Sequence, residues 1–511
     1  MNNSMRLKIR EFCLQHSNVY LYGAGRRGAV YYNILKELGF SPKGILTTHG
    51  DGSLNGIKCE VAQSIDWNNN NDIGVILAVT ENTQNEILES STIKCDVLAL
   101  NEYEYEILIS EYYVSILQEL YSNYPPITTE KDAIKEDTIN SILIIQLEVT
   151  FGDMIWSTAF LRELRSNHMS SSITILINEK YVSLFEHCPF IDRIIPYDCS
   201  SLQEIISKDM VKRARTLCGN LLNEKYDILF LPRHIPLSLS DAWENILIAL
   251  MCKAKYRIAH GIGITRAGIY RCEMIGQFFS KLVVHTCGEH EVEYDLDLIR
   301  AVGGVVSDER MEVWLSKDSY NTVRPLLQDK TKCYISVALV GSEEKRSLSP
   351  EKYNTIFRKL IEKYGDLIRF VLCGGEDSIE AAEISKNGIE GSCIDLTNRT
   401  SLLSAAAAIN MCCFYVGSDT GLMHFASALG KPVIEISASI QDAPDYWGCS
   451  PTRTGPWRVP NIVLRPPAGL DGCRYMCSMK FRHCIEQINV YQVVRAVSYM
   501  IETFYMRNDY I

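Results

Sequence analysis

The sequence predicts an α/β protein in which parallel β-strands alternate with helices. Three times along the 511 residues, an apolar run rich in β-branched residues is followed by a glycine-containing turn and a helical pattern. This order is typical of βα units, which build parallel sheets. The composition, 47% apolar and 22% charged, is that of a globular protein, and the length exceeds what one hydrophobic core usually organises. We therefore expect several Rossmann-like domains.

The first of these units begins with a predicted strand at 18–22, a turn at 23–28 and a helix over 29–38. Further strands are expected at 44–47, 73–79 and 95–100, and the unit is expected to end near Ser115. The polar segment that follows contains Pro125-Pro126 and is the predicted linker.

The second and third units repeat the pattern. The second has predicted strands at 141–145, 173–177, 193–196 and 228–231, with a turn at 151–153 and a helix over 154–165. The third has predicted strands at 333–338, 367–373, 412–416 and 432–436, with helices over 350–364, 401–408, 422–429 and 490–506. The predicted domains are therefore 1–120, a linker at 121–140, then 141–320 and 321–511. Two successive domains of this kind imply a cleft, with ligands at the carboxyl ends of the strands.

Charge and targeting signals narrow the function. The formal net charge of −11 lacks the basic footprint of nucleic-acid binders, so no nucleic-acid partner is expected. The first 15 residues have no apolar core like that of a secretory signal, and no run approaches the roughly 20 apolar residues of a membrane span. We expect a cytoplasmic protein, with a peripheral position at the inner membrane face as the alternative.

The turn at 417–421 is the strongest ligand-binding candidate. It follows an apolar strand and supplies two glycines, Asp419 and Thr420 directly before a helix. Backbone N–H groups at a helix N-terminus bind phosphate, and Gly421 would let the backbone approach a ligand. An alternative interpretation is that Asp419 and Thr420 only cap the helix.

The segment from Val416 to Val433 resembles the signature of glycosyltransferase family 9, the ADP-heptose:lipopolysaccharide heptosyltransferases. Four other segments resemble the family in the same order: 151–153 with Ser157-Thr158, 290–293 with 296–298, Lys345-Arg346 with Pro350-Glu351, and 370–375. The resemblance covers roughly 141–500. It implies the GT-B architecture, two Rossmann-like domains facing a cleft, preceded here by a small Rossmann-like domain.

The resemblance also implies an activity, the transfer of a sugar from a nucleotide sugar, with ADP-heptose as the first expectation for the donor. The implied acceptor is lipopolysaccharide, another glycan, another lipid-linked molecule or a protein. The transfer is expected to invert the configuration of the anomeric carbon. The resemblance further implies that Asp153 is the catalytic base, although Asp153 could instead cap the following helix. No aspartate-any-aspartate motif lies in the expected place, so we expect no cofactor in catalysis. The implied site residues fall into three groups: donor and phosphate contacts from Lys345, Arg346, Ser418, Asp419, Thr420, Gly421, Met423 and His424; an acceptor loop at Phe151 and Gly152; and nucleotide ribose contacts from Gly374, Gly375 and Glu376.

Three of the eighteen cysteines are clustered, at Cys473, Cys477 and Cys484. Thiolates at such short spacing can hold a structural zinc or iron ion, with Cys449 or His483 available as a fourth ligand. The alternative is that they are reduced thiols, as expected for the other cysteines.

The N-terminal unit contains Gly23-x-Gly25-x-x-Gly28 between a predicted strand and helix, which is the context of a dinucleotide-binding loop. The second strand, however, ends at Leu46-Thr47-Thr48-His49 without the acidic residue that would hold a ribose diol. A structural or docking role is therefore the alternative for this unit. For the whole chain, the alternatives to a glycosyltransferase are an oxidoreductase that uses this loop and a non-catalytic scaffold that binds nucleotide sugars.

Overall fold

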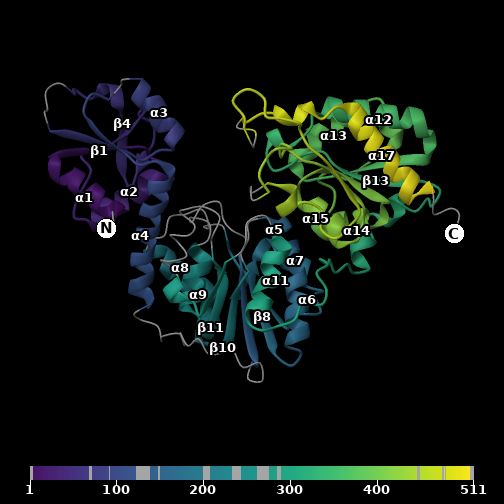
Figure 1. Ribbon diagram of the computed structural model, residues 1–511, viewed down its shortest axis with the longest axis horizontal. Coiled ribbons are helices and arrows are strands. Elements are labelled where there is room, and N and C mark those ends of the chain that lie inside the picture. Colours follow the sequence, from purple (N-terminus) through teal and green to yellow (C-terminus); the bar gives the residue numbers. More distant parts are fainter. Residues whose placement is uncertain are drawn as a thin grey trace. The chain divides into compact units, whose positions relative to one another are not determined.

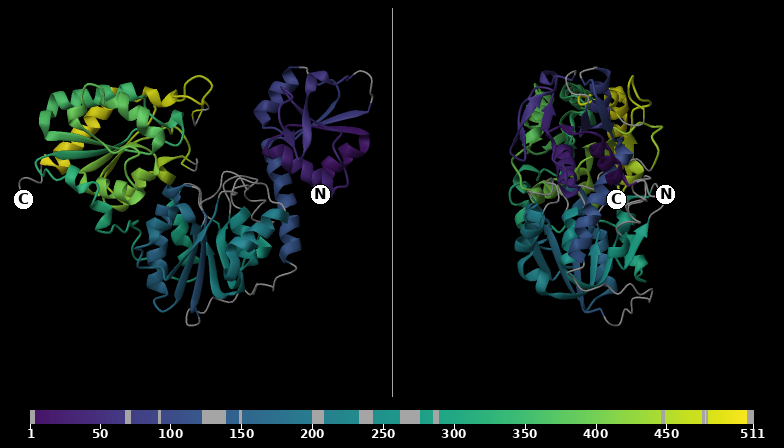
Figure 2. Two further views of the ribbon diagram at one scale, coloured as in Figure 1. Left: turned by 180° about the vertical axis from the view of Figure 1, so that it is seen from behind. Right: turned by 90° about the vertical axis from the view of Figure 1, so that its left-hand side faces the viewer.

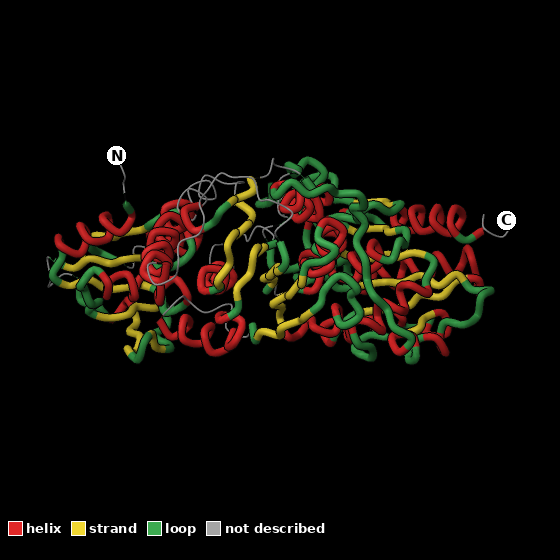
Figure 3. The backbone as a smooth tube through the Cα atoms, turned by 90° about the horizontal axis from the view of Figure 1, so that it is seen from below, coloured by secondary structure: helices red, strands yellow, loops and turns green. Residues whose placement is uncertain are grey.

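Strands and helices alternate along the described parts of the chain, as the sequence predicts (Figure 3). The structure, a computed structural model, describes residues 4–67, 72–90, 93–121, 139–147, 150–199, 208–232, 243–261, 276–284, 289–445, 449–474, 477 and 479–506. The described strands form three six-stranded sheets. This confirms the predicted α/β class.

The chain forms two compact units. The first unit contains Met1–Glu130, Asp198–Leu231 and Ile235–Val284, and the second contains Lys131–Tyr197, Pro232–His234 and His285–Ile511. The predicted linker falls largely at 122–138, outside the described residues. The predicted domain boundaries stay a prediction.

The first sheet lies in the first unit and has the strand order β3-β4-β2-β1-β5-β6. Its strands are β1 (Asn18–Tyr22), β2 (Gly44–Thr47), β3 (Ser53–Leu54), β4 (Ile57–Val61), β5 (Ile73–Leu77) and β6 (Asp96–Ala99). Only β3 pairs antiparallel, with β4. Helices α1 (Met5–Gln15) and α2 (Arg26–Glu37) lie on one side of β1 and α3 (Glu81–Glu89) lies on the other (Figure 1). The last helix, α4, spans Glu102–Tyr121 and so runs past the predicted end at Ser115.

Two glutamates of this sheet's helices cap each other's helix. The backbone N–H of Glu81 donates to Oε1 of Glu102 at 3.0 Å, and the N–H of Glu102 donates to Oε2 of Glu81 at 3.2 Å. Arg27, in α2, forms an ion pair with Glu102. The positive ends of α3 and α4 are thus already neutralised by carboxylates of the same unit.

The second sheet has the strand order β12-β11-β10-β7-β8-β9. Three of these strands belong to the first unit and pair in parallel: β10 (Lys225–Leu231), β11 (Lys253–Gly261) and β12 (Lys281–Val284). The other three belong to the second unit and also pair in parallel: β7 (Ser141–Gln146), β8 (Ser172–Asn178) and β9 (Arg193–Tyr197). The helices here are α5 (Phe151–Trp156), α6 (Thr158–Asn167), α7 (Val182–Phe185), α8 (Lys208–Cys218), α9 (Trp243–Met251) and α11 (Glu291–Ala301).

The single helix predicted over 154–165 is wrong, because the chain forms α5 and α6 with a break at Ser157. The buried Ser157 hydroxyl lies 2.9 Å from the Met154 carbonyl and 2.9 Å from Oε1 of Gln146, at the end of β7. A serine hydroxyl that bonds to nearby backbone competes with the helical pattern. Because of this break, α5 and α6 are two separate helices.

The third sheet has the strand order β15-β14-β13-β16-β17-β18, and all neighbouring pairs are parallel. Its strands are β13 (Cys333–Ala338), β14 (Ile368–Cys373), β15 (Cys393–Asp395), β16 (Phe414–Ser418), β17 (Val433–Ile436) and β18 (Asn461–Leu464). Helices α12 (Pro350–Tyr364), α13 (Ile379–Lys386) and α17 (Val490–Phe504) cover one face, and α14 (Leu402–Met411) and α15 (Gly421–Ala428) cover the other (Figures 1 and 2). All six residues of β13 are buried, as expected for a central strand covered on both faces.

One row of residues crosses this sheet near its carboxyl edge. Ala338 pairs with Cys373 on one side and with Gly417 on the other, and Gly417 pairs with Glu435. The segments that follow these residues therefore leave the sheet at the same edge, where parallel sheets bind ligands. In the described part of the chain, no helix is both long and apolar enough to cross a membrane.

Candidate active site

The turn before α15 is shorter than the sequence predicts. The strand expected at 412–416 is β16, which spans Phe414–Ser418, so Gly417 and Ser418 belong to the strand. Ser418 is fully buried there, and a Cβ on Gly417 would lie 2.5 Å from the Ala338 carbonyl oxygen. Gly417 is therefore required by the close approach of two strands, and only Asp419 and Thr420 form the turn.

The alternative that Asp419 and Thr420 only cap the helix with their side chains is wrong. Thr420 is the N-cap residue of α15, but its side chain makes no capping hydrogen bond. Its hydroxyl lies 3.3 Å from the hydroxyl of Tyr415. The carboxylate of Asp419 instead forms an ion pair with Arg346.

Arg346 and Asp419 form a largely buried charged pair at this edge. Arg346 belongs to the short 3-10 helix Glu344–Arg346, and its Nη1 donates to the Ser342 hydroxyl at 2.9 Å. Burial raises the pKa of Asp419, although Arg346 opposes the shift. Burial lowers the pKa of Arg346, but the Asp419 carboxylate outweighs this and holds it above its ordinary value. Lys345 points to a different partner, Glu343, with Nζ 2.8 Å from Oε2.

His424, one turn into α15, connects this pair to α5. Its Nδ1 accepts a hydrogen bond of 3.2 Å from the indole N–H of Trp156, and its Nε2 lies 3.8 Å from Oδ1 of Asp419. The imidazole and the indole pack edge to face, with ring centroids 4.8 Å apart. His424 thus lies between Trp156 and Asp419, and the sequence analysis did not identify Trp156.

Helix α5 packs on the N-terminal end of α15 through two glycines. A Cβ on Gly421 would lie 2.3 Å from the Phe151 ring, and a Cβ on Gly152 would lie 3.0 Å from the His424 ring. The Phe151 and Phe425 rings are 5.1 Å apart. Gly421 was expected to make room for a ligand, but in this structure it makes room for Phe151.

Asp153 lies in the first turn of α5, and Thr150 is the N-cap residue. The cap position predicted as an alternative for Asp153 is therefore taken by another residue. The carboxyl group is half-buried. Because α5 packs on α15, the structure brings the 151–153 segment and the 419–424 segment together.

Gly374, Gly375 and Glu376 follow β14 at the same edge of the sheet, with β13 between β14 and β16. Glu376 is exposed and begins the short 3-10 helix Glu376–Ser378. A Cβ on Gly374 would lie 2.3 Å from the Ser378 hydroxyl, so this glycine packs against the turn that follows it. These three residues lie beyond the tight group formed by Arg346, Asp419 and His424.

Glu435 is a buried acid beside the candidate site that the sequence analysis did not identify. It lies in β17, paired in register with Gly417, and is buried. Burial, together with the Asp419 carboxylate, raises its pKa to about 8. The signal was present as a lone acid inside the apolar run Val433–Ile436. Buried carboxyls with displaced pKa values cluster at functional sites.

A second group of contacts joins α11 to the segment 453–457. His290 caps α11, stacks on the Trp457 ring at 4.3 Å between centroids, and its Nε2 lies 3.0 Å from the Gly455 carbonyl oxygen. Glu291 and Arg453 form a buried ion pair. The 290–293 segment therefore connects α11 firmly to the loop after α16 (Pro451–Thr454).

The turn between β1 and α2 contains Gly23 and Gly25 and is shorter than expected, because α2 begins at Arg26 and includes Gly28. Gly23 has a φ of +123°, and a Cβ on Gly28 would lie 2.0 Å from the Gly23 carbonyl oxygen. Gly25 is the N-cap residue of α2. At the end of β2, Thr48 lies 3.0 Å from the hydroxyl of Tyr22. Packing alone explains Gly23 and Gly28, whereas a nucleotide-binding role for the turn stays a prediction.

The three clustered cysteines meet as predicted, and His483 joins them. The Nδ1 atom of His483 lies 3.6, 3.8 and 3.5 Å from the Sγ atoms of Cys473, Cys477 and Cys484, and the first two Sγ atoms are 3.9 Å apart. All four ligand atoms lie within 4.8 Å of one another. In a tetrahedral site with metal–sulfur bonds of about 2.3 Å and metal–nitrogen bonds of about 2.0–2.1 Å, ligand atoms are roughly 3.5–3.8 Å apart. We call these four residues the Cys–His cluster; it has the ligands and the spacing to bind a metal ion.

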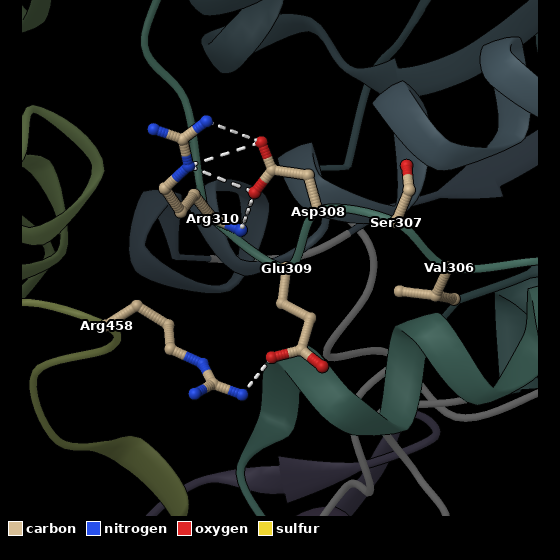
Figure 4. Close-up of a pocket in the computed structure, with 6 residues that line it drawn as sticks. All are labelled: Val306, Ser307, Asp308, Glu309, Arg310 and Arg458. Atoms are coloured by element: carbon tan, nitrogen blue, oxygen red, sulfur yellow. Dashed lines mark hydrogen bonds and ion pairs between the residues drawn. The ribbon is translucent and has the colours of Figure 1, made fainter.

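Two cavities of the second unit lie away from these residues. One, of about 360 Å³, is lined by Val306, Ser307, Asp308, Glu309, Arg310 and Arg458 (Figure 4). Arg310 pairs with Asp308, and Arg458 pairs with Glu309, so both arginines are occupied by carboxylates (Figure 4). The other, of about 380 Å³, reaches the C-terminal end of α15. Neither includes the predicted site residues.

Comparison with known proteins gives a consistent result. Residues 215–468 match glycosyltransferase family 9 (heptosyltransferase). The chain is 21% identical over 304 residues to lipopolysaccharide heptosyltransferase 3 of Escherichia coli K12, which covers 56% of this chain and 79% of that protein.

Solved structures show the same fold. A family 9 glycosyltransferase from Veillonella parvula is 20% identical with a TM-score of 0.53, covering 71% of this chain and 97% of its own. The ADP-heptose lipopolysaccharide heptosyltransferase II of E. coli is 19% identical with a TM-score of 0.52, covering 71% and 98%. The expected GT-B arrangement of Rossmann-like sheets is confirmed.

Proposed function

The chain belongs to glycosyltransferase family 9, and from this premise we propose that it transfers heptose from ADP-heptose to a glycan, lipid-linked or protein acceptor. Two features support this donor. The names of two similar proteins specify heptose transfer to lipopolysaccharide, and one specifies ADP-heptose. The observation that carries the proposal is the packing of α5, with Asp153, on the start of α15, beside the buried Arg346–Asp419 pair.

We assign the donor diphosphate to the start of α15. The backbone N–H groups of Thr420 and Gly421 lie at the start of the helix, where its dipole favours negative charge. The N–H of Met423, in the first turn, also donates to the Thr420 carbonyl oxygen at 3.0 Å. Lys345 and Arg346 add positive charge. Ser418 is buried in β16 and Asp419 is held by Arg346, so their proposed role is to fix the turn. His424 is a positioning residue between Trp156 and Asp419.

We assign the acceptor hydroxyl to the side of α5, at Phe151, Gly152 and Asp153. The Asp153 carboxylate takes the proton of the hydroxyl while its oxygen forms a bond to the anomeric carbon. The bond from that carbon to the diphosphate breaks, and the diphosphate leaves with the electron pair. Attack from the opposite face inverts the anomeric centre. Lys345, Arg346 and the α15 N-terminus stabilise the charge on the leaving diphosphate, so the proposed chemistry needs no catalytic metal.

Glu376, with Gly374 and Gly375, is proposed to contact the nucleotide ribose. It is exposed at the carboxyl edge of the sheet, as acidic residues are in related nucleotide-binding folds. A Glu376→Gln variant is expected to weaken ADP binding without changing the pH dependence of transfer.

The base assignment is tested with Asp153→Asn. Calorimetric titration with ADP should give the wild-type affinity, whereas transfer from ADP-heptose should fall by at least about 100-fold, the range of general-base catalysis. Asp318→Asn, at an exposed position in the 3-10 helix Asp318–Tyr320, is the matched control and should change neither. Full transfer by Asp153→Asn would remove Asp153 from the mechanism.

The same titration separates the two other functions. Binding of NAD and not of nucleotide sugars would favour an oxidoreductase that uses Gly23, Gly25 and Gly28. Binding of a nucleotide sugar with no transfer to any glycan, lipid-linked or protein acceptor would favour a scaffold. Titration with ADP-heptose against other nucleotide sugars identifies the donor.

We also propose that the Cys–His cluster binds one structural zinc or iron ion. Three sulfurs and one imidazole nitrogen at tetrahedral spacing suit either metal, with all four positions taken by the protein. Elemental analysis should find about one equivalent of zinc or iron in the wild-type chain and a large loss in Cys484→Ser. A metal-free wild-type chain, purified without chelator, would refute this assignment.

A further inference from the structure

The Cys–His cluster lies directly beside the core of the third sheet. Cys484 begins the short 3-10 helix Cys484–Gln487, and the next residue, Ile485, is fully buried in the core with Ile488. Cys477 and Cys484 pack on Ile440, in the segment that follows β17. The cluster therefore packs directly on the segment that leaves the carboxyl end of β17.

Glu486 joins the cluster to the start of α12. Its Oε1 accepts from the backbone N–H of Ser349, the N-cap residue, at 2.6 Å, and its Oε2 lies 2.6 Å from Nζ of Lys352. Lys352 also donates to the carbonyl oxygens of Glu486 and Ile488, at 2.7 and 3.1 Å. The Lys352 side chain is largely buried. These charge-assisted bonds fix the two segments to each other.

A second connection reaches the donor segment itself. Arg482, next to His483, donates to Glu344 at 2.6 Å. Glu344 begins the 3-10 helix that contains Lys345 and ends at Arg346, which pairs with Asp419. Because the Arg482–Glu344 pair is partly exposed, it contributes little alone. The Glu486 contacts are the stronger of the two connections.

We propose that the Cys–His cluster is a metal-dependent positioning element for the donor site. A bound ion fixes the residues around Cys484; through Glu486 and Arg482 these hold the segment 344–352 in place, and with it Arg346. Metal ligands and folding are coupled in this way when the site does not persist without its ion. The inference rests on the proposed function, because it assigns donor binding to Arg346 and the start of α15.

The experiment compares the full chain with metal, after removal by chelator, and after reloading. Hydrogen exchange should rise in the segment 344–352 when the metal is removed, and should stay unchanged in α6, which serves as the internal control for global unfolding. Calorimetric titration should show ADP binding weakened by at least about tenfold, the equivalent of one charge-assisted hydrogen bond. Reloading should restore both.

Two variants separate the connection from the metal itself. Glu486→Ala keeps all four ligands, so it should retain its metal and still show faster exchange in 344–352 and weaker ADP binding. Glu502→Ala removes an exposed ion pair with Lys363 in the same domain and should behave as wild type.

Hydrogen exchange in the segment 344–352 that is unchanged after metal removal, or unchanged in metal-loaded Glu486→Ala, would overturn the inference, whether or not ADP affinity changes. If exchange responds as expected but the metal-loaded wild-type chain does not bind ADP, the positioning connection holds and the proposed function fails.

Discussion

The indole N–H of Trp156 donates to Nδ1 of His424 over 3.2 Å, joining residues that lie 268 positions apart in the chain. An Nδ1 atom that accepts a hydrogen bond carries no proton, so the neutral ring has its proton on Nε2. That atom lies 3.8 Å from Oδ1 of Asp419. Trp156 thus selects the tautomer that presents a donor to the carboxylate paired with Arg346.

Trp156→Phe keeps an aromatic ring in α5 but removes the N–H donor. The buried acceptor on His424 then loses its partner, which we expect to cost about 1–3 kcal/mol of unfolding free energy. Transfer should fall more than ADP binding, because the change reaches Asp419 only through His424. Urea unfolding and steady-state kinetics measure the two effects. The matched control is Trp314→Phe, whose N–H donates to Glu312 away from this site; equal losses in the two variants would contradict a specific role for Trp156.

Gly421→Ala tests the contact between α5 and α15. The added Cβ would lie 2.3 Å from the Phe151 ring, so the ring must move, at a cost of about 1–3 kcal/mol for overpacking. In the double variant with Phe151→Leu, most of that loss should be recovered, which a double-mutant cycle by urea unfolding measures. Gly391→Ala adds a Cβ that meets nothing within 4 Å and should be nearly neutral. Additive effects of the two substitutions would show that Phe151 and Gly421 are not in contact.

Glu435 should make stability fall as pH rises. Its pKa in the folded protein is about 8, above the ordinary value of 4.5, so between these pH values the folded state holds a proton that the unfolded state lacks. Its contribution is fully present below about pH 4.5 and is lost as pH rises through about 8. Urea unfolding from pH 5 to 8.5 should show a less negative slope for Glu435→Gln than for the wild-type chain. Parallel profiles would mean that Glu435 is ionised in the folded protein at neutral pH.

Glu291→Gln should be strongly destabilising. Glu291 and Arg453 form a buried ion pair, with side chains 2% and 6% exposed, and the change leaves the Arg453 charge without its carboxylate. Breaking a buried pair from one side costs about 3–5 kcal/mol, which urea unfolding measures. Glu293→Gln, from a partly exposed pair with Arg300, should cost less than about 1 kcal/mol. A small effect at both positions would show that the Glu291–Arg453 pair contributes little to stability.

The sequence predicted most elements of the third sheet because its strands are continuous apolar runs. The strand over 333–338 and the helix over 350–364 were predicted with the bounds that the structure shows. In contrast, β11 was missed. It contains Lys253, Lys255 and the buried Arg257, whose charges conceal the pattern of a strand. Arg257 is accommodated by the carbonyl oxygens of Leu250 and Cys252, a partnership visible only in three dimensions.

The sequence could predict which segments form the candidate site, but not which residues contact one another there. Asp419 and His424 stood out through a short motif at a strand-to-helix turn, and Cys473, Cys477 and Cys484 through their spacing. The partners of these residues come from distant parts of the chain: Trp156 for His424 and Arg346 for Asp419. Nothing in local sequence specifies such pairs, because they depend on how α5 and the segment 344–346 pack against α15.

The reciprocal caps of Glu81 and Glu102 affect how the N-terminal unit reaches its structure. Each carboxylate serves a helix that begins 21 residues away. The start of α4 also has a local cap, because Asn101 Oδ1 accepts from the N–H of Glu104 and Glu104 Oε2 accepts from the N–H of Asn101. A peptide over α3 alone lacks the Glu102 carboxylate at its first turn, so we expect α3 to gain stability once α4 has formed beside it.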